Sequence, residues 1–541
     1  MTEPDSAMTP GRQDDMKTTQ AKPVKPDSAY SRYALVVLVV VYVFNFLDRQ
    51  ILSILAEDIK ADLGISDAQI GFLYGTAFAV FYAVFGIPMG RLADNWVRTR
   101  LIAVGLAFWS LSTALSGLAR SFAPLAACRF AVGIGEASAS PAANSLLADY
   151  FSPKARATVV SIYASGIYIG SGIGIFLGGS IVEAWNAMYP SIGDAPFGLR
   201  GWQVAFMAVG LPGLLVALWV ATLREPQRGI SEGLTVETNP HPFRAMGQEL
   251  LGIIPPFNLF SLVRHRGGTG AIARNLAIAA ACAVSAWVLW KLTDDLVQWT
   301  ALAIAVYASA SWVQGLMLRD PDAFERLFRN PALLLAMFGF PFITFMTYGV
   351  GFWVAPYMIR FFGISPGELG LTLGLVSAVA GWCGLVSGGL VADALYRRMI
   401  AGRFIIALAA AAVSVPVLFY FAGTESQTAA YVALFAFFFV SSSWLGASFS
   451  AISDLAPPAV RSTAIALYLL LITFIGLALG PHMIGYMSDA LTTRGADGAT
   501  ALRSALLLSL VALVPGVALI SAAALIHTRR SREARGPETT T

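Results

Sequence analysis

The chain has 541 residues, of which 57% are hydrophobic and only 13% are charged. Together with a mean hydropathy of +0.67, this composition excludes an ordinary soluble enzyme and indicates a protein that crosses the membrane many times. The net charge of +4 comes largely from short basic loops, so it bears on membrane orientation and not on nucleic-acid binding.

Apolar stretches follow one another along almost the whole chain. A membrane-spanning helix needs roughly 20 predominantly apolar residues, and by this criterion the sequence predicts about 14 spans. The predicted spans start near Tyr33, Ser66, Thr99, Phe122, Arg156, Arg200, Ala271, Leu296, Pro331, Pro366, Ala401, Gln427, Arg461 and Ala501. Because Lys and Arg collect in alternate loops and in both tails, the positive-inside rule places the termini in the cytoplasm of a cell-membrane protein.

The sequence repeats itself. Gly64-Ile65-Ser66 recurs as Gly363-Ile364-Ser365, and the same offset superposes Gly90…Asp94 on Gly389…Asp393. A second correspondence matches Asp149…Arg156 with Asp454…Arg461. We therefore expect two pseudo-symmetric bundles of six helices, formed by residues 33–224 and 331–528.

The remaining segments are assigned by composition. We expect a disordered cytoplasmic tail over residues 1–32, a polar cytoplasmic linker over 225–270 and a cytoplasmic tail over 529–541. An inserted hairpin of two spans, residues 271–319, has no counterpart in either half, so we expect it to be accessory.

The loop after the second span of each half carries a recognisable motif. Gly90-x-Leu92-Ala93-Asp94 is followed by Arg98-x-Arg100, and the second copy is Gly389…Asp393…Arg397-Arg398. With six plus six helices, these motifs resemble the major facilitator superfamily. The resemblance implies alternating access, in which the two bundles rock about a site at mid-membrane.

Other motifs narrow the resemblance. Asp48-Arg49 in the first span, the stretch from Arg129 to Glu136 in the fourth span, and Ala148-Asp149-Tyr150-Phe151 are similar to those of Spinster-like transporters. Members of that family are associated with the export of sphingolipids or lysophospholipids. The resemblance therefore implies an amphipathic, lipid-like substrate.

Four charged residues lie where their neighbours are apolar: Asp48, Arg49, Arg129 and Glu136. A charge at the centre of a membrane helix costs about 2.5–3.5 kcal/mol on insertion scales, so we expect these side chains to face the bundle interior. We interpret Asp48 and Glu136 as proton-coupling carboxylates, because desolvation and nearby arginines oppose one another in setting carboxyl protonation. A structural ion pair between the first and fourth spans is the alternative.

The second half forms the same bundle without these charges. The repeat places Thr347 and Tyr348 at the positions of Asp48 and Arg49, and Ser441 at that of Glu136. We expect the residues that contact substrate or balance charge to be Arg49, Arg129, Tyr168, Thr347, Tyr348 and Ser441. Arg49 is suited to an anionic head group, since guanidinium binds phosphate or carboxylate through paired donors.

Charged residues in the loops suggest a cytoplasmic gate. We expect Asp94 to pair with Arg98 and Arg100, Asp393 with Arg397 and Arg398, Asp149 with Arg156, and Asp454 with Arg461. Gly90 and Gly389 begin the two motifs and complete the predicted gate. The alternative is that the basic residues only set topology.

No nucleotide-binding loop, metal-ligand cluster or hydrolase motif is recognisable, so we expect a transporter without cofactor or metal and not an enzyme. The favoured function is proton-coupled transport of an amphipathic lipid-like substrate by a monomer. Proton-coupled symport of a small organic anion is the first alternative. A non-transporting receptor or an enzyme on a transporter fold is the second.

Overall fold

The computed structural model describes residues 25–232, 239–254, 256–264 and 268–535. Most of the predicted N-terminal tail lies outside these ranges. In the described residues, 13 helices are long and apolar enough to cross a membrane. One further predicted span, residues 122–150, is divided into two shorter helices. The described residues form helices and no strand, which confirms the expected all-helical, multi-pass fold.

The first half contains six spans, two of them divided. Its helices are α1 (Ala29–Leu63), α2 (Asp67–Tyr74), α3 (Thr76–Asn95), α4 (Arg98–Ser116), α5 (Phe122–Glu136), α6 (Ala139–Tyr150), α7 (Arg156–Met188) and α8 (Gly201–Ala221). A short 3₁₀ turn, η1 (Pro196–Gly198), precedes α8.

The second half repeats this order. Its helices are α14 (Pro331–Phe362), α15 (Pro366–Arg398), α16 (Gly402–Gly423), α17 (Gln427–Ser443), α18 (Leu445–Leu455), α19 (Arg461–Leu471), α20 (Leu479–Thr492), α21 (Gly498–Leu508) and α22 (Leu513–Arg535). The 3₁₀ turns η3 (Pro458–Val460) and η5 (Ser509–Ala512) lie between them, and the π-helical segment η4 (Ile472–Ala478) joins α19 to α20.

The repeated Gly-Ile-Ser sequence ends one helix and begins the next. Gly64 and Gly363 end α1 and α14 in the left-handed conformation, with φ of 63° and 65°, which glycine adopts without steric cost. Two residues later, Ser66 and Ser365 cap α2 and α15 by accepting hydrogen bonds from backbone amides. Local sequence therefore sets the same boundary in both halves.

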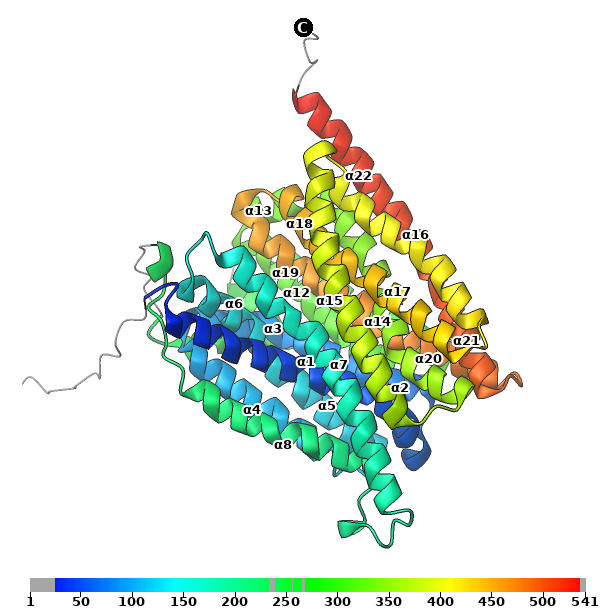
Figure 1. Ribbon diagram of the computed structural model, residues 1–541. Helices are drawn as coiled ribbons and strands as arrows, with labels where there is room; N and C mark the ends of the chain where they lie inside the picture. The colour runs from blue at the N-terminus through cyan, green and yellow to red at the C-terminus, as the bar shows by residue number, and fades with distance from the viewer. Residues whose placement is uncertain (1–24, 233–238, 255, 265–267, 536–541) are drawn as a thin grey trace, which may run out of the picture.

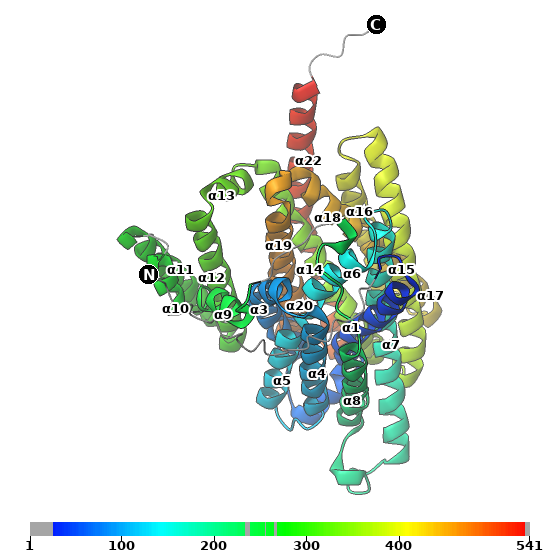
Figure 2. The same cartoon turned by 90° about the vertical axis from the view of Figure 1, so that its left-hand side faces the viewer.

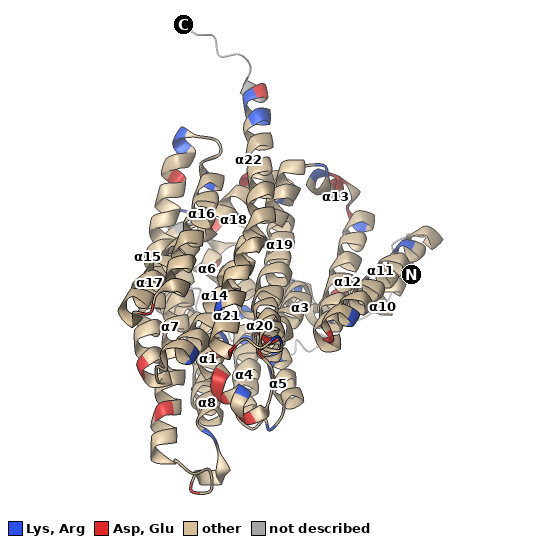
Figure 3. Cartoon of the chain, turned by 90° about the vertical axis from the view of Figure 1, so that its right-hand side faces the viewer, with Lys and Arg blue, Asp and Glu red and all other residues tan. Residues whose placement is uncertain are grey.

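The two halves approach each other at one end and spread apart toward the other (Figure 1). They meet where α1 and α14 end and where α2 packs on α20. We call this the acidic side, and we call the side where α1 begins and α22 ends the basic side. Charged residues are sparse along the spans and gather toward the helix ends (Figure 3).

Helix α7 packs closely against helices of both halves. Its glycines at positions 170 and 174 face α1, where an added Cβ would lie 2.3 Å from the Val43 carbonyl oxygen and 2.8 Å from that of Leu47. On another face, Gly179 approaches Pro366 of α15 so closely that a Cβ there would lie 2.0 Å from its carbonyl oxygen. Small residues therefore allow backbone contact within the half and across it.

Between the halves, the chain forms η2 (Ile230–Glu232), α9 (Pro242–Leu251), α10 (Phe257–Arg264), the hairpin α11 (Gly268–Thr293) and α12 (Leu296–Arg319), and α13 (Pro321–Phe328). Figure 2 shows the hairpin standing beside the two bundles. Helix α12 packs against α3 of the first half and η4 of the second. The hairpin therefore contacts both halves.

Candidate functional site

A buried ion pair joins the first and fourth spans. Arg49 on α1 donates from Nε to Oε2 of Glu136 at 2.7 Å, and its Nη2 lies 2.6 Å from the same oxygen. Glu136, at the end of α5, is fully buried, and the Arg49 side chain is 10% exposed. The structure thus brings together two of the charges that the sequence placed at similar depth, although their function is untested.

Asp48 lies beside this pair. It is fully buried, and neither carboxylate oxygen has a hydrogen-bond partner of normal geometry among the described residues. The polar groups of Thr113 and Trp109 lie next to it, and its charge interacts with those of Glu136 and Arg129. The protein therefore holds a carboxyl group at membrane depth with few direct partners.

Arg129 on α5 completes a group that we call the central cluster: Asp48, Arg49, Arg129 and Glu136. Its guanidinium is fully buried and donates to the backbone carbonyls of Asp48 and Leu73, each at 3.4 Å. Since Arg129 forms no ion pair within 4.0 Å among the described residues, its charge acts on the two carboxylates from a short distance without direct contact.

Aromatic rings surround the cluster. The guanidinium of Arg49 lies 4.1 Å from the ring centre of Phe78 and 4.9 Å from that of Tyr82. Tyr348, on α14 of the second half, lies near enough to interact with Arg49, and Tyr168 lies near Tyr348. Two of the residues predicted to contact substrate are therefore close to the cluster: Tyr348 of α14 lies beside Arg49, and Tyr168 of α7 lies beside Tyr348.

Two other predicted residues make no polar contact with the cluster. The hydroxyl of Thr347 donates to the carbonyl of Ile343 at 3.0 Å, and that of Ser441 donates to Phe438 at 3.4 Å. Both acceptors belong to the same helix as the donor, as is common for hydroxyls in apolar surroundings. The sequence repeat identified these two positions, but it did not determine which acceptors their hydroxyls would bind.

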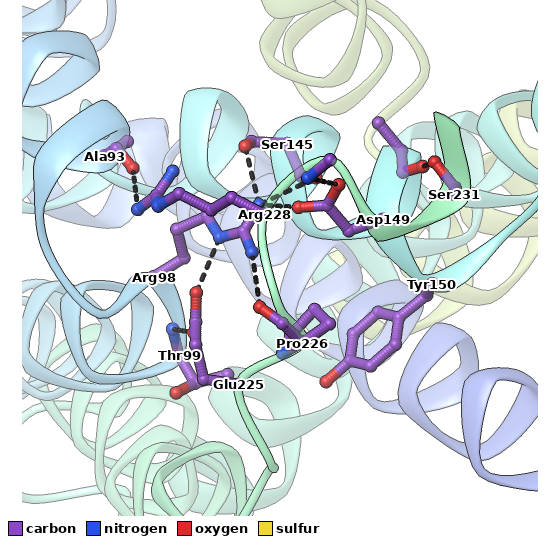
Figure 4. Close-up of polar contacts among 12 residues, drawn as sticks. Ala93, Arg98, Thr99, Ser145, Asp149, Tyr150, Glu225, Pro226, Arg228 and Ser231 are labelled. Carbon is purple, nitrogen blue, oxygen red and sulfur yellow. Dashed lines mark hydrogen bonds and ion pairs between the residues drawn. The ribbon is translucent and has the colours of Figure 1, made fainter. Parts of the chain in front are cut away.

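On the basic side, Arg98 is the centre of a buried network in the first half (Figure 4). Its side chain is 1% exposed. It donates to Asp149 at 2.5 Å, to Glu225 at 2.7 Å and to the carbonyl of Pro226 at 3.1 Å. The network therefore holds the start of α4, the end of α6 and the segment after α8 together.

Arg228 extends this network. It donates to the carbonyls of Ala93 and Trp96 at 2.7 and 2.6 Å, and the amide of the next residue, Gly229, donates to Asp149 at 2.9 Å. Burial and the neighbouring Arg98 charge lower the pKa of Arg228 below its usual value. The segment after α8 is thus held by the end of α3, the residue that follows it and the end of α6.

The ion pairs expected for Asp94 are not present among the described residues of this structure. Arg98, at the first turn of α4, reaches the end of α6 instead of the end of α3. Asp94 and Arg100 form no ion pair among the described residues, and a Cβ added at Gly90 would meet nothing within 4 Å. Asp94 therefore lies near Arg98 and Arg228 only as a longer-range charge partner.

The pairing of Asp149 with Arg156 is also not observed. Arg156 instead forms an ion pair with Glu232 at 2.9 Å and donates to the carbonyl of Ala148 at 3.1 Å. Since Arg98 and Gly229 already donate to Asp149, the segment that follows α8 supplies a separate acidic partner for Arg156.

The second half has a corresponding network around a different arginine. Arg403, at the start of α16, pairs with Asp454 at the end of α18 and lies 3.7 Å from Asp393. This ion pair corresponds to that of Arg98 with Asp149, because each joins the start of a third span to the end of a fourth. The offset that superposes Asp149 on Asp454 also superposes Arg98 on Arg403, a signal that the sequence contained.

The other predicted partners in this half are not engaged as expected. Arg397 and Arg398 are exposed and form no ion pair among the described residues. Arg461 donates to the carbonyl of Ser453 at 2.9 Å and not to Asp454, and a Cβ added at Gly389 would meet nothing within 4 Å. In this structure the ion pairs of Arg98 therefore lie within the first half and the segment that follows it, and those of Arg403 lie within the second half. The role of these residues as a cytoplasmic gate stays a prediction.

Among the residues that the structure describes, the ion pairs that join the halves lie on the acidic side. Arg360, near the end of α14, donates to Glu57 of α1 at 3.0 and 2.7 Å and to Asp67 of α2 at 2.7 and 2.6 Å. Lys60 also pairs with Asp67 at 2.6 Å. Because the Asp67 and Arg360 side chains are only 2% and 11% exposed, water screens these contacts weakly.

Helix α20 adds a second set of contacts between the halves. Asp489 accepts hydrogen bonds from the amides of Asp67 and Ala68 at 3.1 and 2.7 Å, and Ser488 donates to Asp67 at 2.7 Å. A carboxylate is favoured at the start of α2 by the helix dipole. We call Glu57, Asp67, Arg360, Ser488 and Asp489 the acidic-side network.

Sequence analysis missed this network, although one signal was available. Arg360 is a lone arginine at the end of a span whose flanking loop is expected outside the cytoplasm, where basic residues are depleted. Such a residue is more informative than an arginine in a basic loop, because topology does not explain it.

The comparison with protein families agrees with the fold and the paired motifs. The family model of the Major Facilitator Superfamily matches residues 38–481. The chain belongs to this superfamily. An MFS-type efflux pump of Mycolicibacterium smegmatis is 26% identical over 480 residues, covering 89% of each chain. Protein spinster homolog 1 of Mus musculus is 25% identical over 484 residues, covering 85% of this chain and 74% of the relative.

Solved structures extend this similarity. A bacterial homolog of the human lysosomal transporter Spinster, in an inward-facing and unoccupied conformation, superposes with a TM-score of 0.69 at 25% identity, covering 93% of this chain and 99% of the other. A proton-dependent oligopeptide transporter, with a TM-score of 0.59 at 15% identity, shows the fold alone. The resemblance to Spinster-like transporters is thus confirmed, and the protein is a multi-pass transporter of the superfamily.

Proposed function

We propose that this transporter is a proton-coupled secondary carrier that works by alternating access and moves an amphipathic, lipid-like substrate. The observation that supports the proposal most strongly is the central cluster. It contains two carboxylates, Asp48 and Glu136, with 0% exposure at membrane depth. One is paired with Arg49 and the other has no hydrogen-bond partner of normal geometry among the described residues.

The two carboxylates differ in a way that suits proton coupling. Glu136 has a direct cation, Arg49, whereas Asp48 has Arg129 only at a longer range. A buried carboxylate without a direct partner is easier to protonate than one held by arginine. We infer that both carboxylates take part in proton exchange: Asp48 is protonated more readily, and Glu136 can be protonated once substrate competes for Arg49.

The positions at which the halves are joined support the proposal of alternating access. The acidic-side network crosses between the halves, while the networks of Arg98 and Arg403 each remain within one half. We infer that the structure represents a state closed on the acidic side. The basic-side networks then keep each half rigid while the halves rock.

Two observations support the substrate proposal: the side chains around Arg49 and the relation to Spinster-like transporters. Arg49 offers a cation within a wall of aromatic rings, which fits an anionic head joined to an apolar body. The confirmed relation to Spinster-like transporters favours a lysophospholipid or sphingolipid-like molecule. A small organic anion would also bind Arg49, but it would make less use of the surrounding aromatic rings.

We further propose that the protein is a monomer in the cell membrane with both termini in the cytoplasm. The basic residues near both ends of the chain and in alternate loops support this orientation. The acidic side then faces outward, and the state seen here opens toward the cytoplasm.

The proposal is tested in proteoliposomes with an imposed pH gradient. Transport of a labelled lysophospholipid is compared with that of a labelled dicarboxylate for the wild type, Asp48→Asn and Glu136→Gln. We expect the lysophospholipid to be carried and both variants to lose stimulation by the gradient while keeping their thermal stability. Asp194→Asn, an exposed loop carboxylate, is the matched control and is expected to behave as wild type.

Variants of Arg49 distinguish substrate binding from proton coupling. Arg49→Ala should reduce both lysophospholipid affinity and gradient-driven transport, and Arg49→Lys should recover part of the affinity because it keeps the charge but not the paired donors. If the carboxylate variants transport with unaltered pH dependence, the coupling proposal fails. If they unfold while the control stays folded, the cluster is a structural ion pair.

A further inference from the structure

An apolar cavity lies between the hairpin and the second half, away from the central cluster. Its volume is about 620 Å³. It is lined by side chains of α11, α12, α13, α14, α19 and η4, among them Ile278, Val306, Ala310, Phe338, Leu470 and Phe474. Because most of its walls are helices that are long and apolar enough to cross a membrane, we expect the cavity to lie at the depth of lipid chains.

The polar side chains in the wall are few, and two of them already have partners. Ser309 donates to the carbonyl of Ala305 at 2.8 Å, and Gln314 donates to that of Ala271 at 2.7 Å. Neither therefore needs a polar ligand. The cavity suits a saturated or unsaturated hydrocarbon chain.

Arg274 is the one ionised side chain among the residues lining this cavity. It lies on the second turn of α11, near the basic side, and it is exposed. Its guanidinium donates to the sulfur of Met317 at 3.4 Å, and it has no carboxylate partner within 4.0 Å among the described residues. Four of its five N–H donors are therefore available to an anion.

We propose that this cavity binds an anionic phospholipid of the surrounding leaflet, with an acyl chain between α12 and the second half and the phosphate on Arg274. Charge complementarity selects this occupant: an apolar cavity at acyl-chain depth ends in a free cation at head-group level. Paired guanidinium donors match phosphate oxygens. The lipid fills the space between the hairpin and the second half and holds α12 against η4. It binds independently of the substrate at the central cluster.

The test uses the full-length protein, delipidated in detergent and titrated with phosphatidylglycerol or with phosphatidylcholine of the same chains. Native mass spectrometry counts retained lipids. Wild type is expected to prefer phosphatidylglycerol, and Arg274→Gln is expected to reduce that preference about fivefold. This fold-change corresponds to roughly 1 kcal/mol per basic residue at an anionic membrane surface.

Two further variants make the test specific. Ala310→Trp fills the cavity without removing the charge and should reduce retention of both lipids. Arg244→Gln removes an exposed arginine of α9 that does not line the cavity, and it should leave the preference unchanged. The proposal is overturned if Arg274→Gln keeps the wild-type preference, if Arg244→Gln loses it equally, or if Ala310→Trp retains as much lipid as the wild type.

Discussion

The acidic-side network allows a quantitative prediction about the balance between the two conformations that the proposed alternating access requires. Arg360→Gln keeps a similar length and some hydrogen-bonding capacity but removes the charge that joins α14 to α1 and α2. Because the contacts of Arg360 with Glu57 and Asp67 cross between the halves, they are present only while this side is closed. We therefore expect the substitution to favour opening of the acidic side.

The magnitude follows from the contacts. Arg360 donates four hydrogen bonds to two carboxylates, and each hydrogen bond to a charged group contributes roughly 1.5–3 kcal/mol. The net loss is smaller than the sum, because Glu57 is 25% exposed and Asp67 keeps Lys60 and Ser488. We estimate a loss of about 2–3 kcal/mol, which shifts the equilibrium about 30- to 140-fold.

Pulsed electron paramagnetic resonance measures this shift directly. Spin labels replace Ser191, in the loop after α7, and Thr493, after α20, since both residues are exposed and lie on the acidic side of opposite halves. The background first replaces the three native cysteines, Cys128, Cys282 and Cys383. We expect the population at longer distance to rise in Arg360→Gln.

Arg494→Gln is the matched control, because Arg494 is an exposed arginine near the same end of α20 and forms no ion pair among the described residues. Its distance distribution should match that of the wild type. An unchanged distribution in Arg360→Gln would refute the inference that this network holds the halves together. An equal change in both variants would assign the effect to net charge.

Three further predictions concern the rest of the fold. Asp149→Asn should lower the melting temperature by about 2 °C, since it weakens the 2.5 Å contact with Arg98 at a cost of about 2 kcal/mol. Asp94→Asn should change it little, and equal shifts measured by thermal unfolding would contradict the revised pairing. Gly71→Val should raise cysteine accessibility on the acidic side, because a Cβ there would lie 2.5 Å from the Pro481 carbonyl oxygen; unchanged accessibility would mean that this close approach is not required for closure. Replacing residues 271–318 by a flexible linker should leave a folded protein with measurable transport, and loss of all transport in a monodisperse variant would show that the hairpin is essential.

The number and position of the spans were predictable from sequence because a membrane helix satisfies its own backbone hydrogen bonds, so apolar length alone indicates it. The predicted starts lie close to those observed, with the largest difference at the first span, Tyr33 against Ala29. The duplication was predictable because the residues that mark it act locally. Gly64 and Ser66, like their repeats, act on the backbone next to them and need no distant partner.

The proximity of Arg49 and Glu136 was also predictable, since buried charges in a membrane seek each other and few were available. The partner of each loop arginine was not. A long, flexible arginine in a polar loop has several carboxylates within reach, and helix packing decides among them. The end of α6 lies beside the start of α4, so Arg98 binds Asp149 and leaves Asp94 without an ion pair among the described residues.

Contacts between the halves depended most on the tertiary structure. Arg360 and Asp67 are separated by 293 residues, and no local pattern relates them. Their contact exists because the two bundles tilt together on the acidic side, where glycines let α2 approach α20 closely. Sequence determined each helix and its repeat, whereas the relative tilt of the bundles decided which charges meet, because that tilt is set by packing summed over many helices.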